Sequence, residues 1–264
     1  MNRPIPIRPA VTNYLSWSRI SAFVRCPRQY FFRYVEHVPP DHRPVALVFG
    51  TAWHDAVGEY LEQAGKPTTD ELVEVFAESF DHDIHEQDVP VLFDDDETRE
   101  DLVETARRMI QAFRAKVPPP DELLDRERSF SLELSHPVTC EILPVPVVGS
   151  IDAVVRRGDE RFLLEIKSAK RRWGADQIET DGQTTCYQIA ARELGYPDAK
   201  LELFVTTKAR KPDVQLERLV RHRGDEAEFA ELAFGVLGAI ESGVDFRLRG
   251  WMCRTCPWAG SCSP

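Results

Sequence analysis

The 264-residue chain has an ordinary composition for a folded protein, with 42% hydrophobic and 29% charged residues. Its formal net charge of −11 excludes a bulk basic nucleic-acid binder, so any such site must be a local basic patch. No apolar run approaches the ~20 residues of a membrane span, and Met1 to Val11 lack the apolar core of a secretory signal. We therefore expect a cytoplasmic protein without membrane contact, in which six cysteines indicate metal ligands, a reactive thiol or core residues rather than disulfides.

Residues 13–62 are predicted to form an N-terminal helical segment. Ser16 or Ser18 is the expected cap of its first helix. Pro27 should end that helix and begin another. A third helix should follow Gly50, where apolar residues recur at helical spacing.

Residues 68–120 are predicted to be an acidic helical insertion. Two amphipathic helical patterns flank the run Asp94, Asp95, Asp96 and Glu97, and the triple proline Pro118–Pro120 ends the segment. The plain interpretation, a helical insertion with a solvated acidic face, is the preferred one.

In residues 126–220 the apolar period changes from 3.6 to 2, which is typical of strands. Strands are expected through 130–134, 147–155, 162–166 and 201–205, with a helix over 175–194. A last helix is expected in the C-terminal segment, 224–264. This order predicts an α/β fold, and the length favours a single domain over 1–264.

The segment Arg157–Glu160 is predicted to be a hairpin turn, because Gly158 at its first central position suits a type II′ loop. The residue numbers of each cross-strand pair then sum to 317, which places Asp152 opposite Glu165. Directly opposed residues have Cβ atoms only ~5 Å apart, and like charges there are destabilising. A divalent cation with oxygen ligands would neutralise them.

Lys167 shares the face of Glu165, while Ile166 should point into the core. Mg²⁺ or Mn²⁺ held by Asp152 and Glu165 could polarise a phosphate and activate water, and Lys167 could stabilise the developing charge. The alternative, a solvent-facing Glu165 and Lys167 on a one-sided strand, is equally compatible with the spacing alone. A slip of one residue in register would separate the carboxylates.

Together these residues resemble the PD-(D/E)XK signature of RecB-like nucleases. The resemblance rests on four short motifs, which are Gly149-x-x-Asp152, Glu165-Ile166-Lys167, Gly50-x-x-x-His54 and Gln183-x-x-x-Tyr187, and on the N-terminal run Cys26 to Tyr30. It implies a restriction-endonuclease-like core, a mixed central sheet flanked by helices, and catalytic roles for Asp152, Glu165 and Lys167.

The resemblance also implies how the other motif residues act. His54 and the backbone carbonyl of Ile166 would complete the metal site. Gln183 and Tyr187, which share one helical face, would bind nucleic acid. Taken singly, His54 would more often be an interfacial histidine and Tyr187 a core residue.

Three cysteines are close together in Cys253-x2-Cys256-x5-Cys262, and Cys26 is the candidate fourth ligand. The spacing alone allows tetrahedral zinc or a cubane cluster. The resemblance to the iron–sulfur branch, which contains AddB-type and CRISPR-associated RecB-like exonucleases, implies a [4Fe–4S] cluster that joins the N- and C-terminal regions. Cys140 and Cys186 have no partner pattern and are expected to be small buried hydrophobic residues.

A basic run follows the predicted catalytic strand, with Trp173 beside Lys170, Arg171 and Arg172. Basic groups bind phosphates and an aromatic ring can stack on an unpaired base, so we expect contact with DNA rather than a merely solvated loop. A second cluster contains Lys208, Arg210 and Lys211.

The resemblance implies an exonuclease acting on single-stranded DNA, in repair and recombination or in CRISPR adaptation, with a helicase or CRISPR integrase proteins as partners. The sequence lacks a G-x-x-x-x-G-K-[ST] phosphate loop, so no use of ATP is expected. The alternatives are an endonucleolytic variant, a catalytically idle or partner-dependent nucleic-acid-binding module, and a zinc-stabilised scaffold. The sequence does not determine the polarity of cleavage, whether the substrate is DNA or RNA, or the oligomeric state.

Overall fold

The computed structural model describes residues 12–85, 88–94 and 97–262. The stretch Met1 to Val11, and Asp95 and Asp96 of the acidic run, lie outside the described residues. The chain divides into two compact units. Unit 1 comprises residues 1–41, 130–149 and 221–264, and unit 2 comprises residues 42–129 and 150–220.

Unit 1 is built mainly from helices, namely α1 (Trp17–Arg25), α2 (Pro27–Tyr34), α8 (Arg223–Glu241), the 3-10 helix η1 (Trp251–Thr255) and α9 (Ala259–Cys262). Ser16 caps α1, since its hydroxyl accepts a hydrogen bond from the amide of Arg19 at 3.2 Å. Pro27 occupies the first position of α2, as predicted, because a helix start does not need the amide proton that proline lacks.

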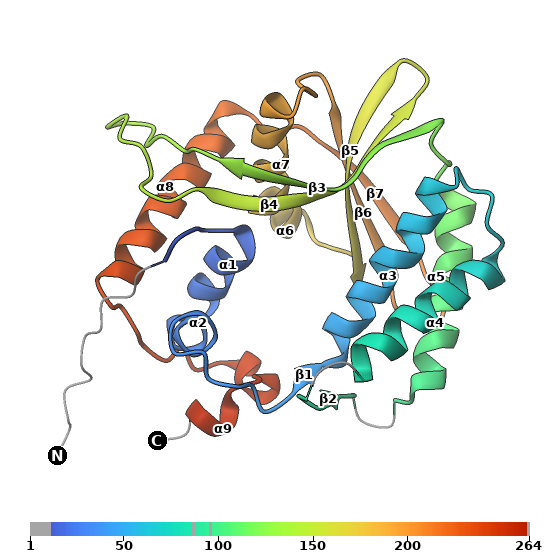
Figure 1. Cartoon of the computed structure of the whole chain (residues 1–264), viewed down its shortest axis with the longest axis horizontal. Helices are drawn as coiled ribbons and strands as arrows, with labels where there is room; N and C mark the ends of the chain where they lie inside the picture. Colours follow the sequence, from blue (N-terminus) through green and yellow to red (C-terminus); the bar gives the residue numbers. More distant parts are fainter. Residues whose placement is uncertain (1–11, 86–87, 95–96, 263–264) are drawn as a thin grey trace. The chain divides into compact units, whose positions relative to one another are not determined.

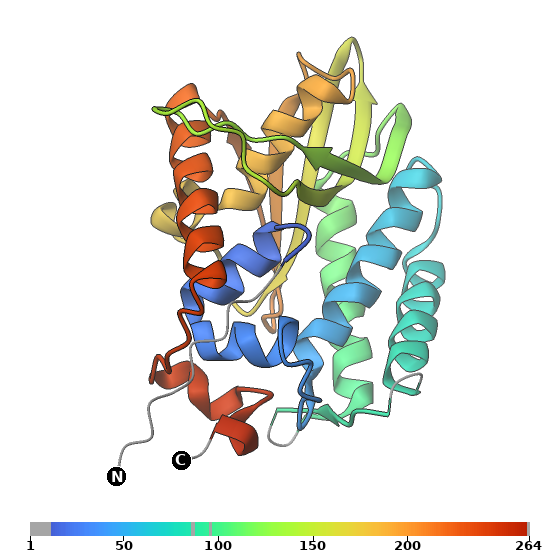
Figure 2. The ribbon, with the colours of Figure 1, turned by 60° about the vertical axis from the view of Figure 1, so that its left-hand side comes forward.

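Two segments far apart in the sequence meet inside unit 1. The indole of Trp258 donates to the carbonyl of Val38 at 2.7 Å, and the amide of Gly260 donates to the carboxylate of Asp41 at 3.0 Å. The C-terminal η1 and α9 therefore lie close to the chain that follows α2 (Figure 2).

A five-stranded mixed sheet, the main element of unit 2, has the order β3-β4-β5-β6-β7. Its strands are β3 (Glu122–Leu132), β4 (Val147–Arg157), β5 (Glu160–Ala169), β6 (Lys200–Thr207) and β7 (Val214–Leu219), and the ends of β3 and β4 belong to unit 1. The β4/β5 and β6/β7 pairs are antiparallel and β5/β6 is parallel. The predicted α/β class with a mixed sheet is confirmed, although the sequence pattern did not predict β7.

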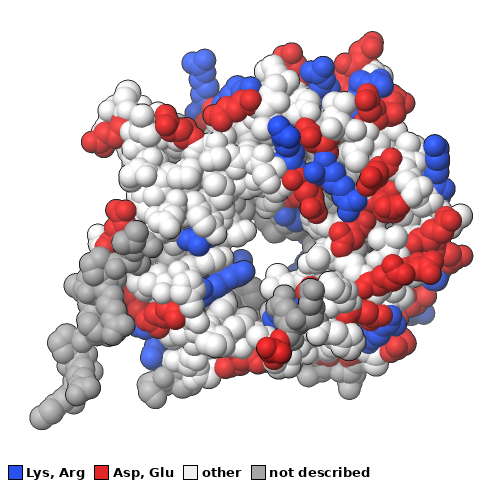
Figure 3. All heavy atoms as spheres, in the orientation of Figure 1, with Lys and Arg blue, Asp and Glu red and all other residues white. Residues whose placement is uncertain are grey.

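Helix α3 (Val45–Glu62) packs against one face of this sheet, and beside it lie α4 (Thr69–His85), which packs on the other two helices, and α5 (Arg99–Lys116), which also contacts the sheet (Figures 1 and 2). The last two are the predicted helices of the acidic insertion, and acidic side chains gather over this part of the surface (Figure 3). The start of α3 was predicted wrongly, because the helix begins at Val45 and runs through Gly50. A short parallel pair, β1 (Arg43–Pro44) and β2 (Val91–Leu92), was also not predicted.

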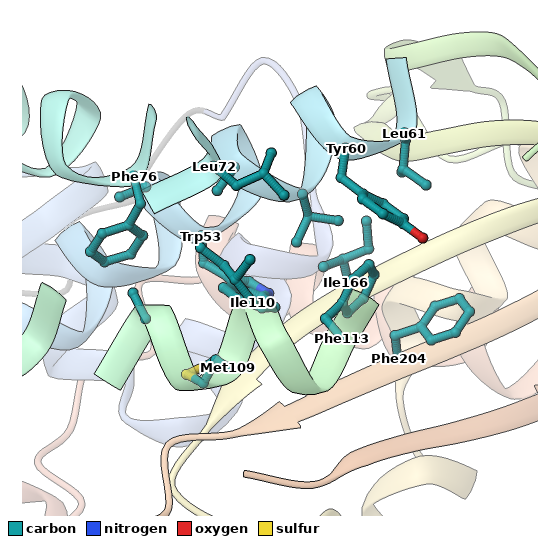
Figure 4. Close-up of a cluster of buried hydrophobic side chains, with 14 of the residues drawn as sticks. Trp53, Tyr60, Leu61, Leu72, Phe76, Met109, Ile110, Phe113, Ile166 and Phe204 are labelled. Atoms are coloured by element: carbon teal, nitrogen blue, oxygen red, sulfur yellow. The ribbon is translucent and has the colours of Figure 1, made fainter. Parts of the chain in front are cut away.

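The core of unit 2 lies between these helices and the sheet (Figure 4). Phe113 of α5 is its centre, with ring centroids 5.8 Å from Trp53, 5.7 Å from Tyr60 and 5.9 Å from Phe204. The Tyr60 hydroxyl donates to the carbonyl of Val117 at 2.7 Å, so this ring buries its polar end without an unmet hydrogen bond. This packing holds α3, and therefore His54, against the sheet.

The predicted helix over 175–194 is two helices, α6 (Ala175–Glu179) and α7 (Gly182–Glu193). The break occurs because Asp181 caps α7, its side chain accepting from the amide of Thr184 at 3.0 Å. Helix α7 packs against β5 and presents Gln183 and Tyr187 to the strand.

Among the described helices, none has the length and apolar character that a membrane crossing would require.

Candidate active site

The β4/β5 hairpin has the predicted register. Arg157 pairs with Glu160 and Ala153 with Leu164, so each pair sums to 317. Gly158 has φ +60°, the left-handed value that the first central position of a type II′ turn needs. Asp152 and Glu165 are the next residues on the two strands beyond the pair Ala153 and Leu164, so the register brings them together.

Two neighbours hold the carboxylate of Asp152. The amide of Ile166 donates to Oδ2 at 2.7 Å, and the hydroxyl of Tyr187 donates to Oδ1 at 3.1 Å. Burial raises the pKa of Asp152, while Lys167 and the Ile166 amide act in the opposite direction. This carboxylate is thus fixed in orientation and poorly solvated.

Glu165 is fully buried and its carboxylate forms an ion pair with the ammonium of Lys167. Burial, and then the nearby charge of Asp152, raise the pKa of Glu165. Burial on its own would lower the pKa of Lys167, but the charges of Glu165 and Asp152 outweigh it and the pKa is raised. Ile166, between these residues, is 3% exposed and lies in the core as predicted.

A chain of hydrogen bonds joins Lys167 to Asp152. The Lys167 ammonium donates to Gln183 Oε1 at 3.0 Å, and Gln183 Nε2 donates to the Tyr187 hydroxyl at 3.0 Å. That hydroxyl then donates to Asp152. Tyr187 is 1% exposed. Gln183 and Tyr187 therefore lie on one face of α7, as predicted, and contact the carboxylate and the lysine directly.

His54 approaches the same place from α3, with Nδ1 3.9 Å from Oδ2 of Asp152. Burial, and then the charge of Lys167, lower the pKa of His54, which favours the neutral imidazole that can ligate a metal. A hydrogen bond to the backbone of Ile166 acts in the opposite direction. His54 and the Ile166 backbone thus adjoin the two carboxylates.

A small cavity lies beside these residues. Its volume is about 10 Å³, close to the space of one water molecule, and its lining includes His54, Glu127, Asp152 and Ile166. Among the described residues, no three His, Cys, Asp or Glu side chains are arranged as a metal site. The donor types, two carboxylates with an imidazole and a carbonyl, nevertheless suit a hard divalent cation.

Glu127 of β3 is a residue that the sequence patterns did not indicate. It has φ +49°, a left-handed conformation that is uncommon outside glycine, within a strand. Its charge raises the pKa of both His54 and Asp152. No periodicity or motif in the sequence distinguishes it, because only the irregular strand directs it to the cavity.

The predicted basic run occupies the loop after β5. Lys170 and Arg171 are exposed, with Lys170 paired to Asp94 at 2.6 Å. Arg172 is paired to Asp213, and Trp173 is half-buried. The loop is held by Gln215, whose side chain accepts from the Trp173 amide at 2.9 Å and donates to its carbonyl at 3.1 Å.

The second predicted basic cluster is not uniformly exposed. Lys208 lies over the ring of Phe49, 3.8 Å from its centroid, and burial lowers its pKa to about 8. Arg210 and Lys211 are exposed.

In unit 1, the four predicted ligand cysteines line one cavity of about 510 Å³. Burial raises the pKa of Cys256, and the neighbouring thiols of Cys262, Cys26 and Cys253 raise it further. Arg28, Arg247 and Arg249 also line this cavity.

The remaining two cysteines differ from each other. Cys186 is 2% exposed, as expected of a core residue. The expectation was wrong for Cys140, which is exposed because it lies in a turn with φ +59° and its amide donates to the carbonyl of His136.

The model of the PD-(D/E)XK nuclease superfamily matches residues 14–263, and the chain belongs to that superfamily. The fold is similar to that of a "Putative exonuclease" from Eubacterium rectale, with a TM-score of 0.53 and 15% identity over 92% of this chain and 87% of that one. At that identity the similarity shows the fold alone.

Two other solved structures have TM-scores too low to carry an argument. They are SSO0001, with a TM-score of 0.37 and 14% identity over 87% of this chain and 90% of that one, and Rai1 of Scheffersomyces stipitis, with 0.23 and 13% over 82% and 64%. No curated protein matches the chain.

Proposed function

We propose that this chain is a divalent-metal-dependent deoxyribonuclease that hydrolyses phosphodiester bonds of single-stranded DNA from an end. The observation that carries the proposal is the close approach of Asp152 and Glu165 on the β4/β5 hairpin, with Lys167 against Glu165. Removing three ionisable groups from water is costly for a fold. Because the chain belongs to a nuclease superfamily, we infer that this arrangement serves phosphodiester hydrolysis.

Nucleases of this superfamily generally use divalent metals. Asp152 and Glu165 would hold Mg²⁺ or Mn²⁺, with the carbonyl of Ile166 and the imidazole of His54 as further ligands. When bound, such a cation polarises a phosphate and lowers the pKa of bound water. Lys167, whose ammonium now lies against Glu165, would then be free to stabilise negative charge on the phosphate while Gln183 holds its ammonium.

The loop after β5 supports nucleic acid as the substrate. Lys170, Arg171 and Arg172 supply phosphate contacts directly after the strand that carries Glu165 and Lys167, and Trp173 supplies an aromatic ring for an unpaired base. A helicase or an integrase of CRISPR adaptation would be a natural partner, because a helicase supplies single strands and an integrase uses DNA whose ends have been trimmed.

The test is degradation of single-stranded DNA labelled at its 5′ or 3′ end, by anaerobically purified protein with Mn²⁺. Glu165→Gln and Lys167→Ala should each remove cleavage. Glu160→Gln, an exposed residue of the same hairpin, should retain it. If the wild-type protein binds DNA but leaves both labelled substrates intact, the chain is an idle or partner-dependent binding module.

We further propose that Cys26, Cys253, Cys256 and Cys262 hold a [4Fe–4S] cluster. They line one cavity of about 510 Å³, which has room for a cluster. Three arginines along the cavity suit an anionic cluster.

The cluster proposal is tested by absorbance near 400 nm and by iron and zinc analysis of anaerobically purified protein. Four irons per chain, lost in Cys256→Ser but retained in Cys140→Ser, would agree with the proposal. One zinc per chain and no visible absorbance would contradict it. Since hydrogen bonds of Trp258 and Gly260 also fasten the C-terminal segment, we expect the Cys256→Ser protein to keep part of its fold.

A further inference from the structure

Unit 1 carries an exposed aromatic and apolar segment beside the cysteine cavity, and its Phe246 and Trp251 belong neither to the lining of that cavity nor to the cleavage site. Trp251 is 83% exposed, Phe246 is 51% exposed and Leu248 is 43% exposed. Tryptophan is highly buried on average, so a ring that stands almost free in water indicates a surface prepared for a partner.

The same segment is basic. Arg247, Arg249 and Arg254 alternate with the apolar residues and are exposed. The only acidic residue between 244 and 254 is Asp245. It is neutralised by Arg28, whose Nε lies 2.9 Å from its carboxylate. On a chain with a net charge of −11, this is a local concentration of positive charge.

The segment is held in place although residues 244–249 form no helix or strand. The amide of Arg28 donates to the carbonyl of Phe246 at 3.1 Å, and the amide of Cys253 donates to the carbonyl of Gly250 at 3.1 Å. Its two ends are thereby fastened to α2 and to the start of η1. A fixed backbone lowers the entropy cost of ordering this surface around a ligand.

We propose that residues 246–254 form a second nucleic-acid site, which binds unpaired bases and phosphates of a single strand. Trp251 would stack on a base, and Arg247, Arg249 and Arg254 would contact the flanking phosphates. An apolar protein partner fits less well, because a guanidinium stands next to nearly every apolar side chain. This inference rests on the proposed function for its ligand class but uses none of the residues that cut.

The experiment measures binding of a fluorescent oligo-dT strand by anisotropy, with the cluster-loaded chain carrying Glu165→Gln to prevent cleavage. Trp251→Ala in that background should weaken binding about 5- to 150-fold, the range expected for loss of one base stack. Trp251→Phe should retain most of the affinity. Val138→Ala, which removes a 77% exposed apolar side chain elsewhere in unit 1, is the matched control and should change nothing.

Two further measurements distinguish phosphate contacts from base stacking. Arg254→Ala, a change outside the lining of the cysteine cavity, should reduce the dependence of log Kd on log salt by about 1, the value for one lost phosphate contact. Blunt duplex DNA should be insensitive to Trp251→Ala, because its bases are not available for stacking. Absorbance near 400 nm and Tm should stay at parental values in every variant used.

Unchanged oligo-dT affinity in Trp251→Ala would overturn the proposal, as would a Trp251-dependent self-association without any effect on DNA. Cleavage by the wild-type chain is measured in parallel. Cleavage together with unchanged affinity removes only the second site. Loss of affinity in Trp251→Ala without any wild-type cleavage removes the nuclease proposal and leaves the second site standing.

Discussion

Replacing Tyr187 by Phe tests whether the hydrogen-bond chain between Lys167 and Asp152 positions the carboxylate that we propose as a metal ligand. The change removes one hydroxyl from a side chain that is 1% exposed. It leaves Asp152 Oδ1 without that donor and Gln183 Nε2 without its acceptor. The resemblance to RecB-like nucleases implies instead that Tyr187 contacts nucleic acid, so the two interpretations make different predictions.

The expected loss of stability is about 2 kcal/mol, because a buried polar group left unpaired costs about 1–3 kcal/mol. For a domain of 150–250 residues this lowers Tm by about 4–8 °C. Removal of a group that orients a ligand typically weakens metal affinity about 10- to 100-fold. At a fixed Mn²⁺ concentration well above Kd, the stabilisation by metal should therefore fall by about 1.4–2.7 kcal/mol.

The assay is a thermal melt with and without Mn²⁺, together with DNA affinity measured without metal. Tyr196→Phe is the matched control, since it also removes a hydroxyl that donates to a carboxylate, that of Asp125 at 2.6 Å. The control should keep the full response to Mn²⁺. If Tyr187→Phe keeps that response but binds DNA less tightly, Tyr187 is a DNA contact and the positioning argument is refuted.

Three more predictions concern the site and its surroundings. The pKa of Glu165 is raised from 4.5 to about 8, so in metal-free protein this residue contributes stability that is fully present below pH 4.5 and is lost as pH rises through 8. Glu165→Gln should flatten that decline in melts with EDTA, and an unchanged profile would show that Glu165 is not the group responsible. Gly149→Ala should destabilise by about 1–3 kcal/mol, because its Cβ would lie 2.4 Å from the ring of Phe130, and an unaltered Tm would contradict this. Glu127→Gly should raise Tm, because the left-handed φ of +49° costs a non-glycine residue about 1 kcal/mol of stability that glycine would not lose. It should also weaken the response to Mn²⁺. A lower Tm would show that this backbone conformation carries no strain.

Gly149→Ala also gives a physical reason for one motif position. In Gly149-x-x-Asp152 the glycine is required by the close approach of Phe130, and Asp152 follows three residues later on the same strand. The sequence presents both as a short pattern. Only the structure shows that the pattern combines a packing requirement with a metal-ligand candidate.

The sequence by itself determined helix starts and turns, because these depend on residues that are close together in the chain. The cap at Ser16, the start of α2 at Pro27 and the two-residue turn at Gly158 depend on the conformational limits of single residues, and the structure has them where they were predicted. The turn fixed the register of the hairpin. Since side chains alternate along a strand, the register in turn brought Asp152, Glu165 and Lys167 together.

Tertiary structure decided the features that depend on residues distant in the chain. The contacts of Gln183 with Lys167 and of Tyr187 with Asp152 depend on how α7 packs on β5, and helical spacing alone could show only that the two residues share a face. The approach of Glu127 depends on an irregular strand, and the gathering of Cys26 with three cysteines more than 220 residues later depends on the packing of α2 and η1 within unit 1. Sequence patterns describe neighbours along one element, whereas these contacts arise from the burial of apolar faces against each other, which no single element specifies.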